Sequence, residues 1–248
     1  MGKLLDKLRR VQAGGRPFCT MIVPAAGSSA RMGGGDKLMM ELEGVPVLVR
    51  TLRALDAAQL VDEIIIATRE DRLLEVADLC RRCGLRKPVR VVQGGENRTQ
   101  SVLAAACEAD AKAQFIAVHD GARPLVTVDL ITHAINALKG NLDADGVVVG
   151  HPSIDTLKVV NGRSIVGTPD RTAFWIAQTP QVFRAKIARR AYKEAMFEGF
   201  VGTDDSSLVE RIGGRVMMLE GPRDNIKVTV PEDVGPVVAA LSARVGQR

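Results

Sequence analysis

The chain has 248 residues, of which 46% are hydrophobic and 25% are charged, as is ordinary for a soluble globular protein. Aromatic residues make up only 3%, which argues against a stacking platform for single-stranded nucleic acid. The formal net charge of +5 is spread along the chain, which favours a phosphorylated small molecule over a polymer as the partner. We therefore expect no nucleic-acid partner.

The sequence also lacks the signals of membrane insertion, secretion and zinc binding. No apolar stretch approaches the ~20 residues of a membrane span, so we expect no membrane partner. Charges interrupt the leucines of residues 1–17, which predicts an N-terminal extension instead of a secretory signal. Cys80 and Cys83 form a single CxxC without a second pair at zinc spacing, so we expect core packing in a cytoplasmic protein.

Short apolar runs alternate with segments of helical period along the chain. Strands are predicted at residues 19–23, 63–68, 89–92, 115–118, 145–150, 215–219 and 226–230. Helices are predicted around residues 48–55, 73–80, 101–109, 131–138, 184–198 and 204–212. Thr127 is a plausible helix cap, and Pro231 opens a final helix. This alternation predicts an α/β fold, a mostly parallel sheet with helices on both faces of the Rossmann-like kind.

One segment breaks the alternation. Asn161-Gly162 lies between two β-prone runs, which is a strong signal for a hairpin. A hairpin inserted into an α/β domain usually projects from it, so we expect an arm over about residues 152–177 that meets a second subunit. Residues 18–245 are expected to form a single domain from which this arm projects.

The loop after the first predicted strand, VPAAGSSARMGGGDK at residues 23–37, combines glycines with two cations. Its spacing matches neither a Walker A loop nor GxGxxG. Ligands of a doubly wound sheet bind beyond the carboxyl ends of the strands. Glycines there let backbone N–H groups approach a polyphosphate, and Arg31 and Lys37 supply positive charge. The alternative is a solvated glycine-rich turn.

Two further segments place charge near the same edge of the sheet. VHDGARP puts Asp120 and Arg123 after a predicted strand, where a single carboxylate beside phosphates commonly holds Mg²⁺. A turn-stabilising aspartate is the alternative reading of Asp120. Lys227 lies inside an otherwise apolar run and needs an anion if it points inward, but alternation leaves its direction open.

Eight short motifs follow one another along the chain: PAAGSSARM with the later DK, GGENRTQSV, HDGARP, DTLK, PDR, QTPQVF, TDDSS and DNIKVT. Their order resembles that of the 2-C-methyl-D-erythritol 4-phosphate cytidylyltransferases of the non-mevalonate isoprenoid pathway. The resemblance covers essentially residues 18–240. Sugar nucleotidyltransferases share the opening loop, so the specificity comes from the whole ordered set.

This resemblance implies transfer of CMP from CTP to 2-C-methyl-D-erythritol 4-phosphate with release of pyrophosphate, and a homodimer formed through the β-arm. The catalytic cations that it implies are Arg31, Lys37 and Lys227, with Asp120 as the ligand of Mg²⁺. The implied CTP-binding residues are Pro24, Ala25, Ala26, Gly27, Gly95, Glu96 and Ser101. The implied substrate-binding residues are Arg123, Thr156, Arg171, Thr179 and Thr203, of which Thr156 and Arg171 would serve the partner subunit.

The expected chemistry requires no general base. A phosphate monoester is largely dianionic at pH 7 because its second pKa is ~6, so it can attack the α-phosphorus of CTP directly. The site then has to supply alignment and positive charge.

Some residues depart from the family pattern. Asp36 precedes Lys37 where PKQ is common, and this carboxylate could weaken CTP binding or be turned outward. Glu96 stands where an aspartate also occurs. The alternatives are a cytidylyltransferase for another polyol phosphate, such as ribitol 5-phosphate, and a non-catalytic nucleotide-binding protein.

Overall fold

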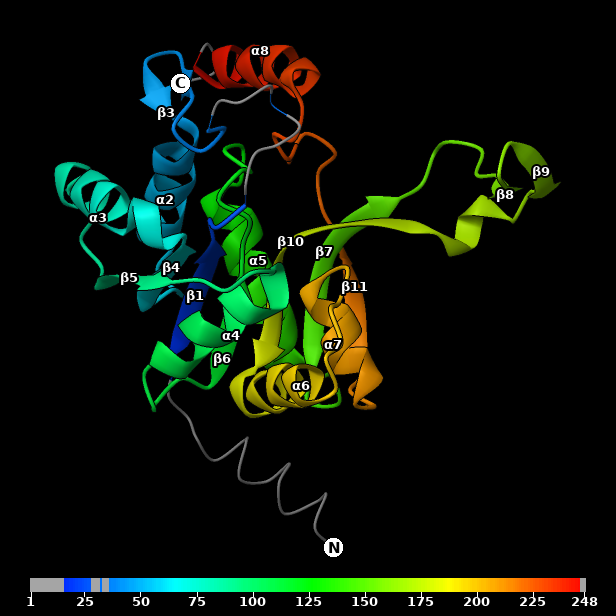
Figure 1. Cartoon of the computed structure of the whole chain (residues 1–248), viewed down its shortest axis with the longest axis horizontal. Helices are drawn as coiled ribbons and strands as arrows, with labels where there is room; N and C mark the ends of the chain where they lie inside the picture. Colours follow the sequence, from blue (N-terminus) through cyan, green and yellow to red (C-terminus); the bar gives the residue numbers. More distant parts are fainter. Residues whose placement is uncertain (1–15, 28–31, 33–35, 246–248) are drawn as a thin grey trace, which may run out of the picture.

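A seven-stranded sheet with the order β11-β7-β10-β6-β1-β4-β5 forms the centre of the molecule (Figure 1). The computed structural model describes residues 16–27, 32 and 36–245. The strands of the sheet are β1 (Cys19–Pro24), β4 (Glu63–Thr68), β5 (Val89–Gln93), β6 (Phe115–Val118), β7 (Gly146–Pro152), β10 (Trp175–Arg184) and β11 (Val216–Glu220). All neighbours pair in parallel except β10, which runs antiparallel to β6 and β7. The predicted mostly parallel α/β sheet is confirmed.

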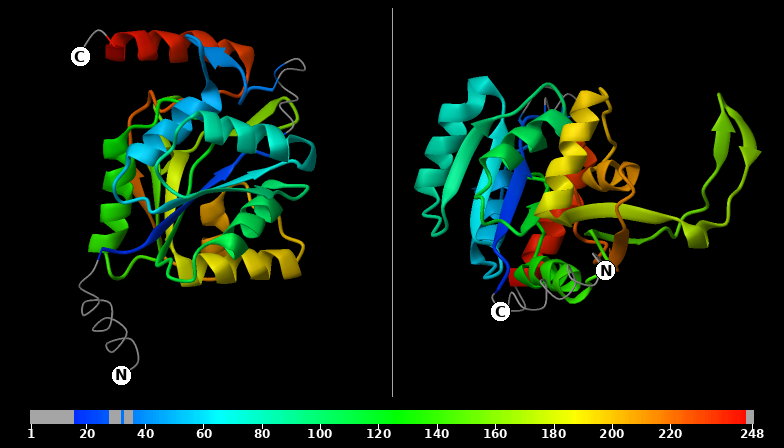
Figure 2. Two further views of the ribbon diagram at one scale, coloured as in Figure 1. Left: turned by 90° about the vertical axis from the view of Figure 1, so that its left-hand side faces the viewer. Right: turned by 90° about the horizontal axis from the view of Figure 1, so that it is seen from below.

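Helices cover both faces of this sheet (Figure 2). One apolar cluster joins the sheet to α2 (Val47–Ala57), α3 (Leu73–Arg82), α5 (Val128–Gly140) and α8 (Val234–Val245). The other joins it to α4 (Arg98–Glu108), α6 (Ala185–Phe197) and α7 (Asp205–Arg211). Successive strand residues point to opposite faces, so Met21 and Val23 belong to the first cluster and Ile22 to the second.

The cap predicted for the helix after Thr127 is present. The Thr127 side chain accepts a hydrogen bond from the Leu130 N–H at 3.1 Å, which satisfies one of the unpaired donors at the start of α5. Short one-turn helices are η2 (Glu70–Arg72), η3 (Arg171–Ala173) and η4 (Pro231–Asp233), and Pro231 thus opens a turn that leads into α8.

The strand predicted at residues 226–230 is wrong. This segment crosses the carboxyl end of the sheet, where the Val228 N–H donates to the Ala122 carbonyl at 2.8 Å. The N–H groups of Thr229 and Val230 donate to the Asp233 carboxylate at 2.7 and 3.0 Å. Loop and side-chain oxygens therefore replace the ladder that an apolar run normally finds in a sheet.

Strand β10 was not among the predicted elements. Pro180 lies inside it and has no N–H to give to a ladder, which argues against a strand at the level of sequence. The structure accommodates it with a shift of register against β7 between Ala177 and Gln181. Two short strands, β2 (Glu41–Leu42) and β3 (Val45–Pro46), form a separate hairpin beside α8 that was also not predicted (Figure 1).

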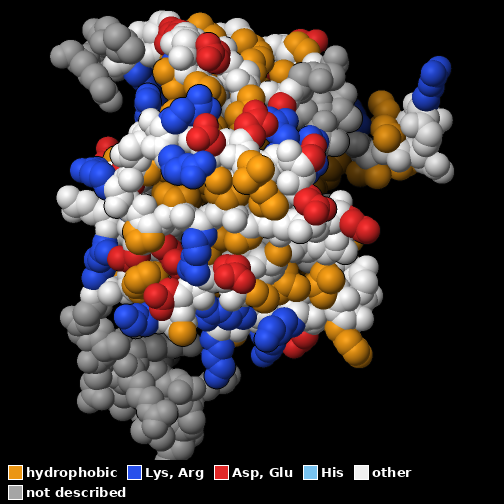
Figure 3. All heavy atoms as spheres, turned by 60° about the vertical axis from the view of Figure 1, so that its left-hand side comes forward, with side chains coloured by type: hydrophobic (Ala, Val, Ile, Leu, Met, Phe, Trp, Pro, Cys, Tyr) orange, Lys and Arg blue, Asp and Glu red, His pale blue; other side chains and the backbone are white. Residues whose placement is uncertain are grey.

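The hairpin predicted at Asn161-Gly162 is present. Strands β8 (Val159–Asn161) and β9 (Ser164–Gly167) pair antiparallel, and Gly162 has a φ of +59°, which a side chain would resist. The hairpin stands away from the sheet on an arm (Figure 1). Apolar side chains on the arm face solvent (Figure 3): Ile154, Val159, Val160, Ile165, Val166, Phe174, Trp175 and Ile176.

Candidate active site

The site residues gather where the order of the sheet reverses. Strand β1 pairs with β4 on one side and with β6 on the other, so the chain leaves β5 at one edge and returns across β1 to form β6. In open α/β sheets the ligand crevice lies at the carboxyl ends of the strands beside such a reversal, and the loops that follow β1 and β6 lie next to each other there, where the Thr51 hydroxyl donates to the Gly121 carbonyl at 3.0 Å. Ligands of open α/β sheets bind at this point.

Asp120, two residues after β6, is the centre of the charge in this region. Only 5% of its surface is exposed. Its Oδ1 accepts from Arg98 Nη1 at 2.6 Å, whereas Oδ2 lies 3.0 Å from Lys227 Nζ and 3.3 Å from Arg123 Nε. Three cations from three separate segments therefore meet on one carboxylate.

These cations determine the protonation state of the carboxylate. Burial by itself raises the pKa of Asp120, but the charges of Arg98, Lys227 and Arg123 together hold that pKa well below its usual range. Asp120 is consequently ionised throughout the physiological pH range. Asp120 thus supplies a buried negative charge at the carboxyl end of the sheet, shared by three cations.

Backbone contacts explain why Lys227 points inward. The bond from Val228 to Ala122 holds the 226–230 segment beside the HDGARP loop, and Arg123 Nη1 donates to the Asn225 carbonyl at 2.6 Å. The Asn225 amide in turn donates to the Thr179 carbonyl at 2.8 Å. The HDGARP, QTPQVF and DNIKVT motifs are therefore brought together by direct hydrogen bonds.

Thr179 and His119 lie behind Asp120. The Thr179 hydroxyl oxygen accepts from the Asp120 N–H and is 3.0 Å from His119 Nδ1. Burial lowers the pKa of His119 to about 4, so this imidazole is neutral at physiological pH. The structure thus places Thr179, a predicted substrate-binding residue, against the backbone of Asp120.

The predicted CTP-binding residues lie on two adjoining loops. Ala25 donates its N–H to the Ala67 carbonyl at 2.7 Å, and Gly94 donates to the Thr68 carbonyl at 2.7 Å, so both loops are tied to the end of β4. A Cβ at Gly94 would lie 3.1 Å from the Ala26 Cβ and 2.8 Å from Ser101 Oγ. Only glycine fits this close approach. Pro24 ends β1, and Ala25, Ala26 and exposed Gly27 follow it.

Ser101 fixes the second of these loops from within. Its hydroxyl oxygen accepts from the Gly95 N–H at 3.1 Å and its hydroxyl donates to the Asn97 carbonyl at 2.8 Å. The Glu96 N–H donates to Gln100 Oε1 at 2.7 Å, and the Glu96 residue is exposed. Gly95, Glu96 and Ser101 are therefore neighbours in space.

The glycine-rich loop lies partly outside the described residues. Arg31 is one of the residues outside, so its predicted role has no structural counterpart here. Lys37 is half-buried. The carboxylate of Asp36 pairs with Arg72 Nη1 at 2.7 Å and accepts from the Leu38 N–H at 2.9 Å. The negative charge beside Lys37 is therefore balanced by a cation from η2.

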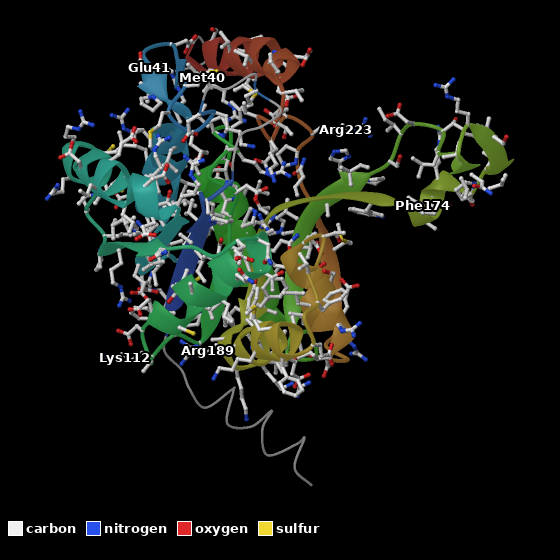
Figure 4. The ribbon with its side chains drawn as sticks, in the orientation of Figure 1. Met40, Glu41, Lys112, Phe174, Arg189 and Arg223 are labelled. Atoms are coloured by element: carbon white, nitrogen blue, oxygen red, sulfur yellow. The ribbon has the colours of Figure 1, made fainter. Side chains whose placement is uncertain are left out.

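Three predicted substrate-binding residues are not part of the Asp120 cluster. Thr156 and Arg171 are exposed on the arm, where Arg171 Nη1 donates to the Ile154 carbonyl at 2.7 Å. Phe174, close to Arg171 in the chain, lies well away from the sheet in Figure 4. Thr203 is exposed just before Asp204, the N-cap of α7. Within one chain these residues remain apart from Asp120.

Arg98 is a site residue that the sequence reasoning missed. It starts α4, directly after Asn97, whose side chain caps the helix by accepting the Gln100 N–H. Its guanidinium bridges Asp120 and Asp205, with Nη2 2.6 Å from Asp205 Oδ2. Burial opposes its charge, but Asp205 and Asp120 raise the pKa of Arg98 above its usual range. The only signal in the sequence was its place inside GGENRTQSV.

An open, mostly parallel sheet, a glycine-containing loop after β1 and an ionised carboxylate among cations after β6 together fit the nucleotidyltransferase class of enzymes. The chain belongs to the 2-C-methyl-D-erythritol 4-phosphate cytidylyltransferase family, because the model of that family matches residues 19–242. This confirms the family predicted from the motifs.

Relatives agree with this assignment over most of the chain. A 2-C-methyl-D-erythritol 4-phosphate cytidylyltransferase of Symbiobacterium thermophilum is 43% identical, covering 90% of this chain and 93% of its own. The enzyme of that name from Caldanaerobacter subterraneus subsp. tengcongensis is 41% identical, with 90% and 97% covered. The crystal structure of 4-diphosphocytidyl-2C-methyl-D-erythritol synthase from Anaerococcus prevotii matches with a TM-score of 0.81 at 30% identity, covering 92% of this chain and 100% of that one.

Proposed function

We propose that this chain transfers CMP from CTP to 2-C-methyl-D-erythritol 4-phosphate by direct in-line attack of the substrate phosphate on the α-phosphorus. Family membership supports the reaction. The observation that carries the site is the meeting of Arg98, Arg123 and Lys227 on Asp120 at the carboxyl end of the sheet. A site already crowded with cations suits a triphosphate and a phosphate monoester that must approach each other.

The nucleophile needs no proton acceptor from the protein. The substrate phosphate is largely dianionic at pH 7, since its second pKa is ~6. His119, the histidine next to Asp120, is fully buried and bonded to Thr179, so it is not positioned as a base. The protein contributes alignment of the two phosphates and stabilisation of charge.

Arg31, Lys37 and Lys227 are the proposed source of that stabilisation. Negative charge accumulates on the five-coordinate phosphorus and on the departing pyrophosphate, and fixed cations placed there lower the barrier. Lys227 is held at 3.0 Å from Asp120 and retains 38% exposure of its side chain. It is therefore oriented by the carboxylate and still accessible to a ligand in the crevice.

Asp120 is the residue that would hold Mg²⁺, whose chemistry there is neutralisation of charge on the phosphates. An ionised carboxylate fits this cation because it supplies the oxygen ligand that Mg²⁺ prefers. Across residues 16–27, 32 and 36–245, no group of three or more His, Cys, Asp or Glu side chains is placed to hold a metal. The remaining ligands would come from phosphate oxygens and water, as Mg²⁺ commonly requires.

The proposed CTP site is formed by the two adjoining loops after β1 and β5. In this proposal Pro24, Ala25, Ala26 and Gly27 form the loop that lies along CTP, and Gly95, Glu96 and Ser101 form the segment that reads cytosine. Ser101 supports this role by fixing the Gly95 backbone with a hydrogen bond of 3.1 Å. Backbone groups held in this way can distinguish the edges of a base.

The proposed acceptor site combines two subunits. Arg123, Thr179 and Thr203 come from the domain at residues 18–245, and Thr156 and Arg171 come from the partner's arm. The exposed apolar side chains of the arm support a homodimer, because a projecting apolar segment is stabilised when a second copy covers it.

No helix in the described part of the chain is long and apolar enough to cross a membrane. We propose a cytoplasmic location.

Pyrophosphate release tests the function. Purified protein is supplied with Mg²⁺ and CTP, and with either 2-C-methyl-D-erythritol 4-phosphate or ribitol 5-phosphate as acceptor; ATP, GTP and UTP are controls. Release with CTP and the first acceptor alone is the expected result. Release only with ribitol 5-phosphate would keep the mechanism and change the substrate. Silence with both acceptors would indicate a non-catalytic nucleotide-binding protein.

A further inference from the structure

A buried chain of polar groups extends from the candidate active site into the protein behind it. The Tyr192 hydroxyl donates to Asp205 Oδ1 at 2.6 Å, and Asp205 Oδ2 accepts from Arg98 Nη2 at 2.6 Å and from Nε at 3.2 Å. Arg98 Nη1 then donates to Asp120 Oδ1 at 2.6 Å. We propose that Tyr192 and Asp205 are positioning residues, which act through Arg98 to orient the Asp120 carboxylate.

The two carboxylate oxygens of Asp120 have different partners. Arg123 and Lys227 both contact Oδ2, whereas Arg98 is the partner of Oδ1. The Asp205 carboxylate receives the other edge of the same guanidinium. Since a guanidinium is planar and its donors form a rigid fork, fixing Nε and Nη2 on Asp205 also fixes the direction of Nη1.

Tyr192 holds the Asp205 carboxylate with a single hydrogen bond. Both oxygens of Asp205 have a partner, one the phenol and the other Arg98. Tyr192 and Asp205 are each only 1% exposed, so water cannot replace either contact. Burial, first of all, raises the pKa of Tyr192 well above its ordinary value, which keeps the phenol a donor at every working pH.

Stability alone does not account for this arrangement. Removing charges from water is costly, and a buried ion pair is often no more stabilising than well-packed apolar residues of the same volume. Here Arg98, whose side chain is 25% exposed, lies between two buried carboxylates, that of Asp120 after β6 and that of Asp205 on α7. A constraint on the direction of Arg98 explains why charged groups are retained at these positions.

The chain contains a matched arrangement far from the crevice. The hydroxyl of Thr20 donates to Glu63 Oε1 at 2.7 Å, and Glu63 Oε2 pairs with Arg90 Nη2 at 2.6 Å. Thr20 is fully buried, and Glu63 stands at the beginning of β4, at the opposite end of the sheet from Asp120. Thr20→Val therefore removes the same kind of hydroxyl-to-carboxylate bond without touching the site.

The test compares Tyr192→Phe, Thr20→Val and Arg98→Lys in the full chain, together with the double variant Tyr192→Phe/Arg98→Lys. We expect Tyr192→Phe to lower kcat/KM for CTP by about 5- to 10-fold, less than the roughly 10- to 100-fold that one hydrogen bond to a charged group is worth, because Tyr192 acts on the site only through Asp205 and Arg98. We also expect it to raise the Mg²⁺ concentration that gives half the maximal rate. In the Arg98→Lys background the same substitution should cost nothing further, since the fork through which it acts is gone. Thr20→Val should lower the melting temperature about as much as Tyr192→Phe does, because each removes one buried hydroxyl-to-carboxylate bond. It should leave the kinetic constants unchanged.

Three results would overturn the positioning role. These are unchanged kinetics in Tyr192→Phe, an equal loss in the wild-type and Arg98→Lys backgrounds, and an equal kinetic loss in Thr20→Val. The inference rests on the proposed function of Asp120, so CTP affinity is measured by calorimetry on the same variants. A wild-type chain that binds CTP but releases no pyrophosphate would contradict the proposed function. The positioning role would then be decided by CTP affinity, which Tyr192→Phe should lower in the wild-type background and leave unchanged in the Arg98→Lys background.

Discussion

Asp120 illustrates how a single side chain acquires its properties from the fold. In the sequence it is one aspartate of HDGARP, with a turn as a sufficient explanation. In the structure it is 5% exposed and contacts Arg98, Arg123 and Lys227, which come from different segments. Those charges keep it ionised although burial favours the neutral form. The role of metal ligand that we propose for Asp120 depends on this balance.

Lys227→Ala should lower turnover by ~10²- to 10³-fold, as expected when one charge-stabilising donor is removed from an active site. The fold should remain intact because the Lys227 side chain is 38% exposed. Steady-state pyrophosphate release and circular dichroism measure the two effects. Lys112→Ala is the control, since Lys112 is exposed at the opposite end of the molecule (Figure 4). Near-normal turnover in Lys227→Ala would contradict the proposed role.

His119 should make stability depend on pH in a defined window. Its folded-state pKa of about 4 lies below the ordinary 6.5, so between these values the unfolded chain binds a proton that the folded chain does not. The contribution of His119 to the free energy of unfolding is therefore fully present above pH 6.5. It is lost as the pH is lowered toward 4, and the loss amounts to roughly 3 kcal/mol.

Urea unfolding of wild type, His119→Gln and His133→Gln at several pH values between 4 and 7 measures this slope. His133 is exposed on α5 and serves as the control. His119→Gln should flatten the slope, whatever its effect on stability at pH 7, and His133→Gln should retain it. An unaltered slope in His119→Gln would assign the pH dependence to other groups.

At the scale of elements, the site depends on loops that are held at fixed distances from one another. The loops after β1 and β5 are both tied to the end of β4 by hydrogen bonds of 2.7 Å. Gly94 lets them meet, because a Cβ at that position would lie 3.1 Å from the Ala26 Cβ. The proposed cytosine and phosphate contacts depend on this spacing.

Gly94→Ala should weaken CTP binding by about tenfold, the effect of roughly 1 to 2 kcal/mol of overpacking between the two loops. Gly140→Ala is the matched control, since Gly140 ends α5 and a Cβ there would meet nothing within 4 Å. Calorimetric titration with CTP gives both affinities. Equal affinities in the two variants would mean that the loop spacing does not govern the nucleotide site.

Two elements show where local pattern and fold disagree. The apolar run at residues 226–230 resembles a strand but crosses the sheet ends and satisfies its N–H groups on Ala122 and Asp233. The segment containing Pro180 was not predicted as a strand, since proline has no N–H for a ladder, but it forms antiparallel strand β10. In both cases neighbours distant in sequence supply or withhold the hydrogen-bond partners, which a local pattern cannot indicate.

At the scale of the whole molecule, the arm separates Thr156 and Arg171 from the Asp120 cluster of the same chain. Its apolar side chains are exposed (Figure 3), and its hairpin stands away from the sheet (Figure 1). A second copy that covers the arm would resolve both features at once. The acceptor site that we propose therefore requires two copies of the chain.

Mixing two inactive variants tests this arrangement. Lys227→Ala removes a charge from the domain and Arg171→Ala removes one from the arm, so a mixed dimer should contain one intact site. We expect pyrophosphate release to reappear when the two variants are unfolded together and refolded, and sedimentation to give the mass of a dimer. A clean monomer, or no recovery from a mixed dimer, would contradict an acceptor site shared between subunits.

The sequence by itself determined the family, the alternation of strands and helices, the Thr127 cap and the Asn161-Gly162 hairpin, because each depends on residues close together in the chain. Ordered motifs also indicated which loops carry the chemistry. The tertiary structure alone decided that Lys227 points to Asp120, that Asp36 pairs with Arg72, and that Arg98 links the site to Asp205 and Tyr192. These contacts join segments that are far apart in sequence, and only the packing of the sheet, helices and loops determines which charges become neighbours.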